Sequence, residues 1–155
     1  MIAHHRFEDH AIMLSEKRFA EKHPFEWQRA ENLVYCDYLE HLLLHILICE
    51  NPPKDVHPLI AGGVGIGGII NLIVPQLNDL FSGWCPNEQR NFWKQRCFER
   101  VKEQKEVYFV LLKRFKTTCK KNRFYTKNCL CHGYNGEGNW PKTRDKEIFE
   151  IIRAL

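Results

Sequence analysis

The strongest hydrophobic pattern in the chain lies in residues 37–50, which read DYLEHLLLHILICE. Leucine and isoleucine dominate this stretch. Asp37 is a favoured N-cap residue, and Glu40 follows three positions later in a capping-box arrangement. Two prolines in the next segment, NPPKD, prevent a helix from continuing. The pattern therefore predicts a helix from about Tyr38 to Cys49.

The segments before this helix predict short elements. The opening MIAHH suits the end of a strand, residues 12–22 have helical character, and residues 26–32 suit another short helical turn. Pro24 marks a break between the last two.

The segments after this helix are mostly helical in pattern. The apolar segment 58–83 contains five glycines near its front, which argue against a helix there, and a short helix is expected from Ile69 onward. A long helix is expected from near Pro86 to near Lys120, and NCLCHGYNGEGNWP reads as a turn-rich loop. TRDKEIFEIIRAL is typical of a final amphipathic helix. The long helix rests on one apolar stripe at spacings of three, four or seven: Trp93, Cys97, Val101, Tyr108, Leu112 and Phe115.

Composition narrows the class of protein. Of 155 residues, 44% are hydrophobic and 27% are charged, which is ordinary for a globular domain. The longest apolar run, PLIAGGVGIGGIINLIV, falls a little short of a membrane span, and no signal peptide is expected because histidines and charges begin at position 4. Seven cysteines at irregular spacing indicate reduced thiols in a cytoplasm.

The net charge of +4 is concentrated in one region. Residues 87–127 contain thirteen Lys or Arg against four Glu, mixed with aromatic residues. Such a segment is what a nucleic-acid partner needs, although a solvated helix face has the same composition. The candidate backbone contacts are Lys120, Lys121, Arg123 and Lys127.

Four histidines have a spacing that suits metal binding. His41 and His45 stand one helical turn apart, so both can offer nitrogens to one ion. A third ligand must come from elsewhere, and the adjacent His4 and His5 can supply it. Successive strand residues point to opposite faces, so one of the pair can bind metal while the other faces a scissile phosphate. The alternative is that these histidines are incidental core and surface residues.

These motifs together resemble a known superfamily. AHH at the start, then NLVY opening on Asn32, then H-x-x-x-H at His41 and His45, look like the HNH, or ββα-metal, endonucleases. The spacing of nine and then four residues from Asn32 is similar to that of colicin and pyocin DNases, and AHH resembles a group of toxin nucleases. The resemblance covers about residues 1–50. Twenty-six residues separate His5 from Asn32, more than compact members have, and the insertion around EDHAIMLSEKRFAEKHPFEW is expected to replace a simple hairpin loop.

The resemblance implies roles for the matching residues. His4, His41 and His45 would bind one divalent metal ion, His5 would be the general base, and Asn32 would hold the loop or orient the base. Histidine titrates near neutral pH, which suits a base. The products would carry 5′-phosphate and 3′-hydroxyl ends, and Arg6 is a candidate phosphate contact. Three imidazoles favour Zn, Ni or Mn over Mg, although any of the four could support catalysis.

The expected fold is a mostly helical α+β structure of three parts. They are a ββα-metal core (1–50), a glycine-rich apolar connector (51–84) and a basic helical region packed on the core (85–155). The expected function is DNA cleavage, with RNA as an alternative substrate, an immunity or inhibitor protein as a partner, and no membrane. The competing hypothesis is a non-catalytic, metal-stabilised module that binds nucleic acid or protein.

Two weaker motifs are compatible with other binding sites, but for both of them a non-binding role is favoured. Gly63, Gly65 and Gly68 spell G-x-G-x-x-G, but no strand clearly precedes them, so a flexible flap or a tight packing turn is favoured over nucleotide binding. A second zinc site could use Cys119, Cys129, Cys131 and His132, but the spacing lacks a C-x2-4-C knuckle, so isolated thiols are favoured.

Overall fold

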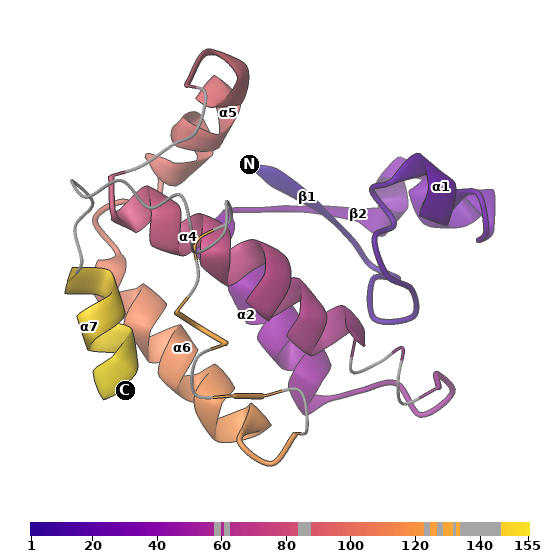
Figure 1. Ribbon diagram of the computed structural model, residues 1–155. Helices are drawn as coiled ribbons and strands as arrows, with labels where there is room; N and C mark the ends of the chain where they lie inside the picture. The colour runs from indigo at the N-terminus through magenta and orange to yellow at the C-terminus, as the bar shows by residue number, and fades with distance from the viewer. Residues whose placement is uncertain are drawn as a thin grey trace.

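The computed structural model describes residues 1–57, 60, 63–83, 88–122, 125–126, 129–131, 133 and 147–155, and for residues 88–91, 147 and 149 the backbone alone. This part of the chain is mostly helical with a two-stranded antiparallel sheet, as the sequence predicts (Figure 1). The N-terminal elements are β1 (Ile2–His5), α1 (Lys17–Ala20), the 3₁₀-helices η1 (Phe25–Gln28) and η2 (Ala30–Asn32), β2 (Leu33–Cys36) and α2 (Tyr38–Glu50). The later elements are the π-helical η3 (Gly63–Gly67) and η4 (Ile69–Ile73), then α4 (Val74–Phe81), α5 (Glu88–Phe98), α6 (Lys105–Cys119) and α7 (Glu147–Ala154).

The two strands form a hairpin whose connection is a lobe rather than a tight turn. Ile2 lies opposite Cys36, and His5 lies opposite Leu33. The lobe carries α1 and η1 and stands beside the helical body (Figure 1). The helix predicted over residues 12–22 is wrong in length, because α1 spans only four residues. Met13 has a φ of 54°, which no right-handed helix admits, so the chain turns there before α1 begins.

Helix α2 has the boundary that its sequence predicts. Oδ1 of Asp37 accepts hydrogen bonds from the backbone N–H groups of Leu39 (2.8 Å) and Glu40 (2.9 Å). Oε2 of Glu40 accepts from the backbone N–H of Asp37 at 2.8 Å, which completes the capping box. The helix ends at Glu50, immediately before the proline-containing segment.

The glycine-rich segment is helical from Gly63, which corrects the prediction of a non-helical front. A continuous helical run extends from Gly63 to Phe81. Gly65 is needed for packing rather than for a turn. A β-carbon on Gly65 would lie 2.6 Å from Sγ of Cys49 on α2, so only glycine lets the two helices approach this closely. Gly65 therefore has a packing role, but within a helix rather than in the predicted flap or turn.

The same run, Gly63–Phe81, is long and apolar enough to cross a membrane by length and composition alone. However, 61% of its most apolar window is buried inside the protein, which is what a core helix shows. Leu77, Ile69 and Val74 are fully buried there.

The long helix predicted from near Pro86 to near Lys120 is two helices, α5 and α6, joined by a turn over residues 99–104. The ring of Phe81 contacts both Phe98 (4.9 Å between centroids) and Tyr108 (5.1 Å). In a straight helix these two residues would be about 15 Å apart along the axis, so one ring could not touch both. The apolar stripe is therefore buried by folding back around Phe81, and Trp93 at its start remains 46% exposed.

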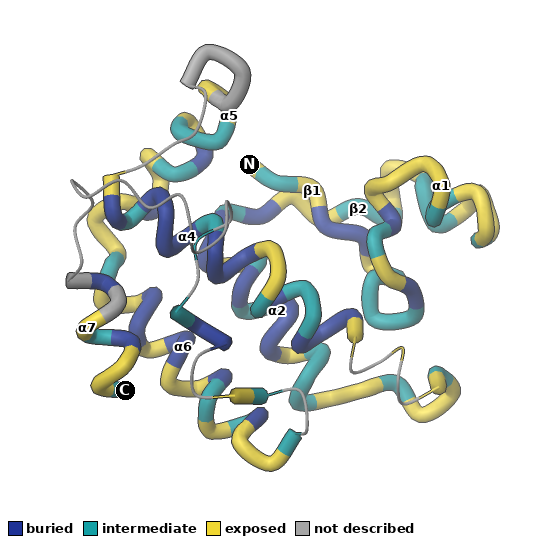
Figure 2. The backbone as a smooth tube through the Cα atoms, viewed as in Figure 1, coloured by how far each residue is buried: buried dark blue, intermediate teal, exposed yellow. Residues whose placement is uncertain are grey.

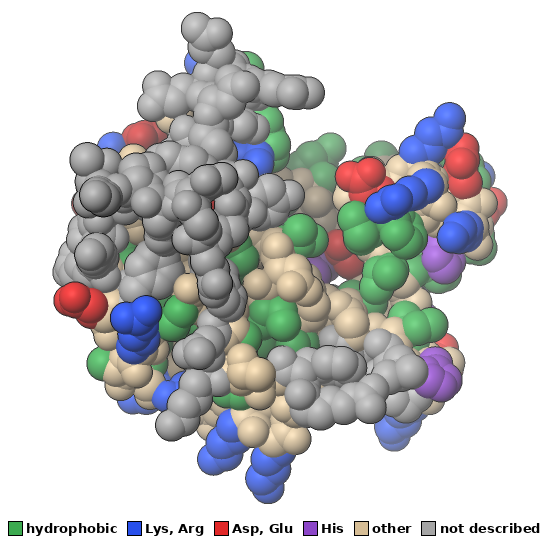
Figure 3. Space-filling model, in the orientation of Figure 1, with side chains coloured by type: hydrophobic (Ala, Val, Ile, Leu, Met, Phe, Trp, Pro, Cys, Tyr) green, Lys and Arg blue, Asp and Glu red, His purple; other side chains and the backbone are tan. Residues whose placement is uncertain are grey.

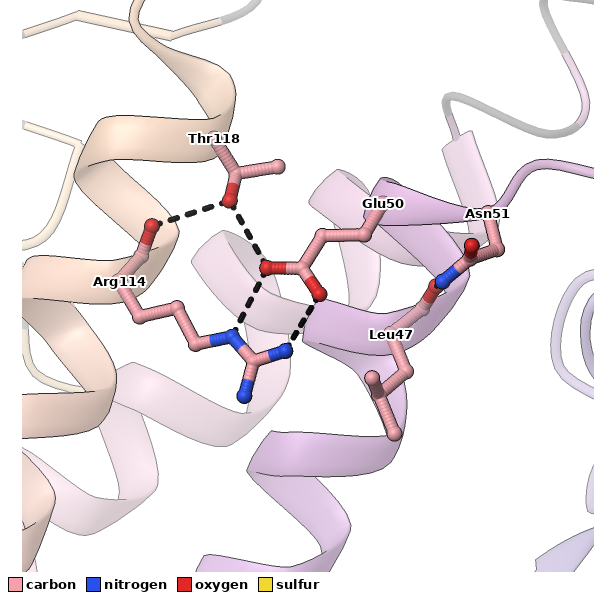
Figure 4. Close-up of polar contacts among 5 residues, drawn as sticks. All are labelled: Leu47, Glu50, Asn51, Arg114 and Thr118. Carbon is pink, nitrogen blue, oxygen red and sulfur yellow. Dashed lines mark hydrogen bonds and ion pairs between the residues drawn. The ribbon is translucent and has the colours of Figure 1, made fainter.

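Helix α6 is fixed to the C-terminal end of α2. Glu50 accepts two hydrogen bonds from the guanidinium of Arg114, at 2.8 and 2.6 Å, and a third from the hydroxyl of Thr118 at 3.1 Å (Figure 4). The apolar faces of α2, the helical run Gly63–Phe81, α6 and α7 meet in one buried cluster (Figure 2). The final helix lies within the segment that the sequence predicts, and the loop predicted before it falls mostly outside the described residues.

Candidate metal centre

Three imidazoles and one carboxylate converge where the hairpin meets α2. They belong to His4 on β1, Glu8 in the turn after β1, and His41 and His45 on α2. One potential ligand atom from each residue lies within 4.8 Å of all the others. Among the described residues, this is the one group of such side chains close enough to share an ion.

The local folds explain why these side chains meet. On α2, residues four apart are stacked, and the rings of His41 and His45 lie 4.9 Å apart between centroids. The capping box fixes the start of α2 directly after β2, so β1, paired to β2, places His4 against the same helix face. The His4 ring lies 5.3 Å from each of the other two rings.

His45 is held in one tautomer by the glycine-rich helix. Its Nδ1 lies 3.1 Å from the carbonyl oxygen of Val64, which can only accept a hydrogen bond, so Nδ1 carries the proton. The lone pair is then on Nε2, and this arrangement is typical of a metal-ligating histidine. A β-carbon on Gly68 would lie 2.6 Å from Nδ1 and Cε1 of His45, so this ring position requires glycine.

Glu8 supplies an ionised carboxylate next to His4. Burial alone would raise its pKa, but the contact with His4 and the neighbouring His45 and His41 outweigh burial and lower the pKa to about 2. Oε2 of Glu8 lies 2.9 Å from Nδ1 of His4. Nδ1 is buried and has no partner with hydrogen-bond geometry among the described residues, although the carboxylate is so near. This nitrogen and the carboxylate oxygen are close enough to bind a common cation or to pair with each other.

The histidines of α2 stay neutral at physiological pH. Burial, together with the nearby His45 and His4, lowers the pKa of His41 to about 3. Burial also lowers the pKa of His45. A metal ligand must be deprotonated, so these imidazoles can bind a cation without first losing a proton. Three imidazoles with one carboxylate fit Zn, Ni or Mn better than Mg, which prefers oxygen ligands.

His5 is buried but lies outside this group. It occupies the opposite side of β1 from His4, and its Nε2 contacts Oε1 of Gln28 at 3.0 Å. The sequence pattern predicts that the two adjacent histidines face different ways, and they do. Asn32 holds the loop: its Nδ2 donates to the carbonyl of Glu26 at 2.8 Å, and its own carbonyl accepts from the backbone N–H of Arg6 at 2.9 Å.

The predicted nucleic-acid contacts are not brought together. Arg6 is exposed beside the histidine pair. Lys120 and Lys121 are exposed just after α6, which ends near the C-terminal end of α2, away from the hairpin (Figure 1). Arg123 and Lys127 lie outside the described residues. In the alternative zinc site, Cys119, Cys129 and Cys131 are free thiols, and His132 is also outside the described residues.

Two residues of the site are absent from the sequence prediction, namely Glu8 and Gln28. A carboxylate four positions after His4 is a visible signal, but four positions along a strand would separate the side chains by about 13 Å. The chain turns directly after β1, where the backbone N–H of Glu8 bonds to the carbonyl of His5 at 3.1 Å. Gln28 carries no signal, since only the folded lobe brings it to His5.

In the space-filling view, histidine and acidic side chains are visible where the lobe meets the helical body (Figure 3). No protein-family model, curated protein sequence or solved structure matches the chain.

Proposed function

We propose that the protein is a metal-dependent endonuclease of the HNH type that hydrolyses phosphodiester bonds of DNA. The observation that carries the proposal is that the two adjacent histidines of β1, His4 and His5, lie in different environments. His4 joins His41, His45 and Glu8 in a group that suits one metal ion, while the adjacent His5 is kept out of that group. A metal ligand beside a separate imidazole is what hydrolysis by a general base needs.

The side chains divide the work as follows. His4, Glu8, His41 and His45 would hold the ion, which when bound supplies positive charge for the phosphate and for the leaving 3′ oxygen. His5 accepts a proton from the attacking water. The products are a 5′-phosphate and a 3′-hydroxyl.

Other residues would act on structure and on substrate binding. Asn32 holds the loop that follows β1, through its bonds to Glu26 and Arg6. Arg6 would contact a phosphate, and Lys120 and Lys121 would add affinity that does not depend on sequence and weakens with salt. RNA is an alternative substrate. The proposed location is a cytoplasm, and the proposed protein partner is an immunity or inhibitor protein.

The test is His5→Ala in a plasmid-cleavage assay with Zn²⁺, Ni²⁺, Mn²⁺ or Mg²⁺. Loss of the base should lower the rate about 10²- to 10⁴-fold, while the affinity for Zn²⁺ stays within about twofold of wild type, because His5 lies outside the ligand group. The control is His57→Ala, which removes an exposed histidine elsewhere. Cleavage by His5→Ala at the wild-type rate would show that the base is another group.

A second candidate is a metal-stabilised module that binds nucleic acid or protein without cutting. The number of candidate metal ligands favours this module, because structural zinc sites have four protein ligands, whereas catalytic sites keep one position open. A six-coordinate ion would keep positions open for water, but if all four residues of the group ligate a four-coordinate ion such as Zn, no position is left. In that case metal would raise the melting temperature strongly, and DNA would be bound but not cut under any metal.

A further inference from the structure

Gln28 connects the candidate base to the lobe. Nε2 of His5 lies 3.0 Å from Oε1 of Gln28, and Nε2 of Gln28 donates a hydrogen bond of 3.2 Å to the carbonyl oxygen of Leu14. A carbonyl oxygen can only accept, so the nitrogen end of the amide must face Leu14. The amide therefore has one orientation, with its oxygen toward His5.

This orientation sets the tautomer of His5. Oε1 of Gln28 can only accept, so the ring atom that faces it, Nε2, carries a proton. In the neutral ring the lone pair is then on Nδ1. A neutral imidazole acts as a base through its unprotonated nitrogen alone, so the tautomer decides which atom can do so.

We propose that Gln28 is a positioning residue that holds His5 in the Nε2-protonated tautomer and makes Nδ1 the atom that takes the proton. The proposed step rests on the proposed nuclease function; the tautomer itself does not. In that step an O–H bond of water breaks and an Nδ1–H bond forms, which leaves His5 as an imidazolium with Nε2–H still bonded to Gln28. The water oxygen forms the new P–O bond, and the 3′ oxygen departs with the electron pair of the bond that breaks.

The lobe holds Gln28 in place through η1. The ring of Trp27, the preceding residue, is stacked between Phe7 (4.9 Å, 10° between planes) and His23 (4.9 Å, 9°). Phe7 lies two residues after His5, so the stack ties η1 to the end of β1. The segment between the strands thus places the oriented amide of Gln28 against the ring of His5.

His45 in the metal group has the opposite tautomer to His5. His45 is protonated on Nδ1 by its bond to Val64 and offers Nε2 to the metal group. His5 is protonated on Nε2 and keeps Nδ1. Two acceptors from different parts of the chain therefore set the two rings in opposite tautomers.

The test is the tautomer of His5 by nuclear magnetic resonance of protein labelled with ¹⁵N-histidine, with the His5 signals identified by their loss in His5→Gln. We expect wild type to show His5 protonated on Nε2 alone. Gln28→Met keeps the side-chain length but cannot accept, so both tautomers should appear, and cleavage should fall about 10- to 100-fold. Gln28→Glu loses the donor to Leu14 but can still accept from Nε2–H, so Nε2 should stay protonated.

Gln76→Met is the matched control, since Gln76 is a half-buried glutamine whose side chain donates to Tyr38 at 2.7 Å, away from His5. It should leave the His5 spectrum unchanged. A wild-type His5 protonated on Nδ1, or a single Nε2 tautomer in Gln28→Met, overturns the proposal, and the wild-type spectrum decides even if Gln28→Met does not fold. If the tautomer of His5 changes as expected but the protein cuts no DNA, the result supports the role of Gln28 and refutes the nuclease.

Discussion

At the level of single residues, the metal group contains the carboxylate of Glu8 as well as three histidines. This carboxylate adds a negative charge among imidazoles that burial keeps neutral. It also lies beside a nitrogen of His4 that has no hydrogen-bond partner among the described residues. A cation would satisfy both atoms.

Glu8→Gln should weaken Zn²⁺ binding about 10- to 100-fold, because the carboxylate touches a candidate ligand and supplies the charge of the group. Titration of the purified protein against a competing chelator measures this. Asp9→Asn is the matched control: the neighbouring carboxylate pairs with His10 instead, and its removal should not change the affinity. Equal affinities in wild type and Glu8→Gln would exclude Glu8 from the site.

The lowered pKa values predict how stability depends on pH when no metal is bound. The pKa of His41 falls from 6.5 to about 3 on folding. Between these values the unfolded chain holds a proton that the folded chain does not. The free energy of unfolding therefore decreases as the pH falls, by about 1.4 kcal/mol per pH unit for one such group. Glu8, with its pKa lowered from 4.5 to about 2, acts in the same direction at lower pH.

Urea unfolding of chelator-treated protein at pH 7, 6 and 5 measures this slope. His41→Gln should flatten it, whereas His57→Gln, a change at an exposed position outside the group, should not. If His41→Gln left the slope as steep as in wild type, His41 would not be a source of the pH dependence.

At the level of elements, the metal group depends on the close approach of two helices. The backbone of the glycine-rich helix supplies the carbonyl of Val64 to His45, and Gly68 leaves space for the ring. Close packing against α2 explains Gly65 and Gly68 in a segment that is nevertheless helical. Helix propensity alone counts these glycines as helix breakers, because it contains no information about a neighbouring helix.

Gly68→Ala should destabilise the fold by about 1–3 kcal/mol and weaken metal binding, because the new β-carbon would clash with His45. Gly63→Ala is the control. Nothing lies within 4 Å of a β-carbon there, so alanine should be neutral or slightly stabilising in the helix. Thermal unfolding with and without Zn²⁺ compares the two. Equal melting temperatures for both variants would show that the helix does not need glycine at position 68.

Local signals predicted the elements that depend on neighbours in sequence. The strand at residues 2–5, the capping box of α2 and the stacked pair His41 and His45 all follow from spacings of a few residues. The break between α5 and α6 could not be predicted in this way. It depends on Phe81 contacting Phe98 and Tyr108 at once, which is a tertiary constraint.

At the level of the whole molecule, the hairpin and its lobe meet the helical body at the candidate centre. His4 comes from the hairpin and His41 and His45 from α2, so the ion would join the two parts. His5 and Gln28 belong wholly to the hairpin and lobe, so the base and the ligands are held by different sets of contacts. The opposite placement of His4 and His5 could be predicted from sequence, whereas the positions of Glu8 and Gln28 could not, because a turn brings in Glu8 and the folded lobe brings in Gln28.

The most direct test of metal-dependent cleavage is the conversion of supercoiled plasmid by the purified wild-type protein, freed of metal and then titrated with Zn²⁺, Ni²⁺, Mn²⁺ and Mg²⁺. We expect no conversion without metal, nicked or linear DNA with at least one of the four ions, and a complete stop on adding chelator. Intact plasmid under all four ions, at protein concentrations that bind the DNA, would contradict the nuclease and favour the binding module.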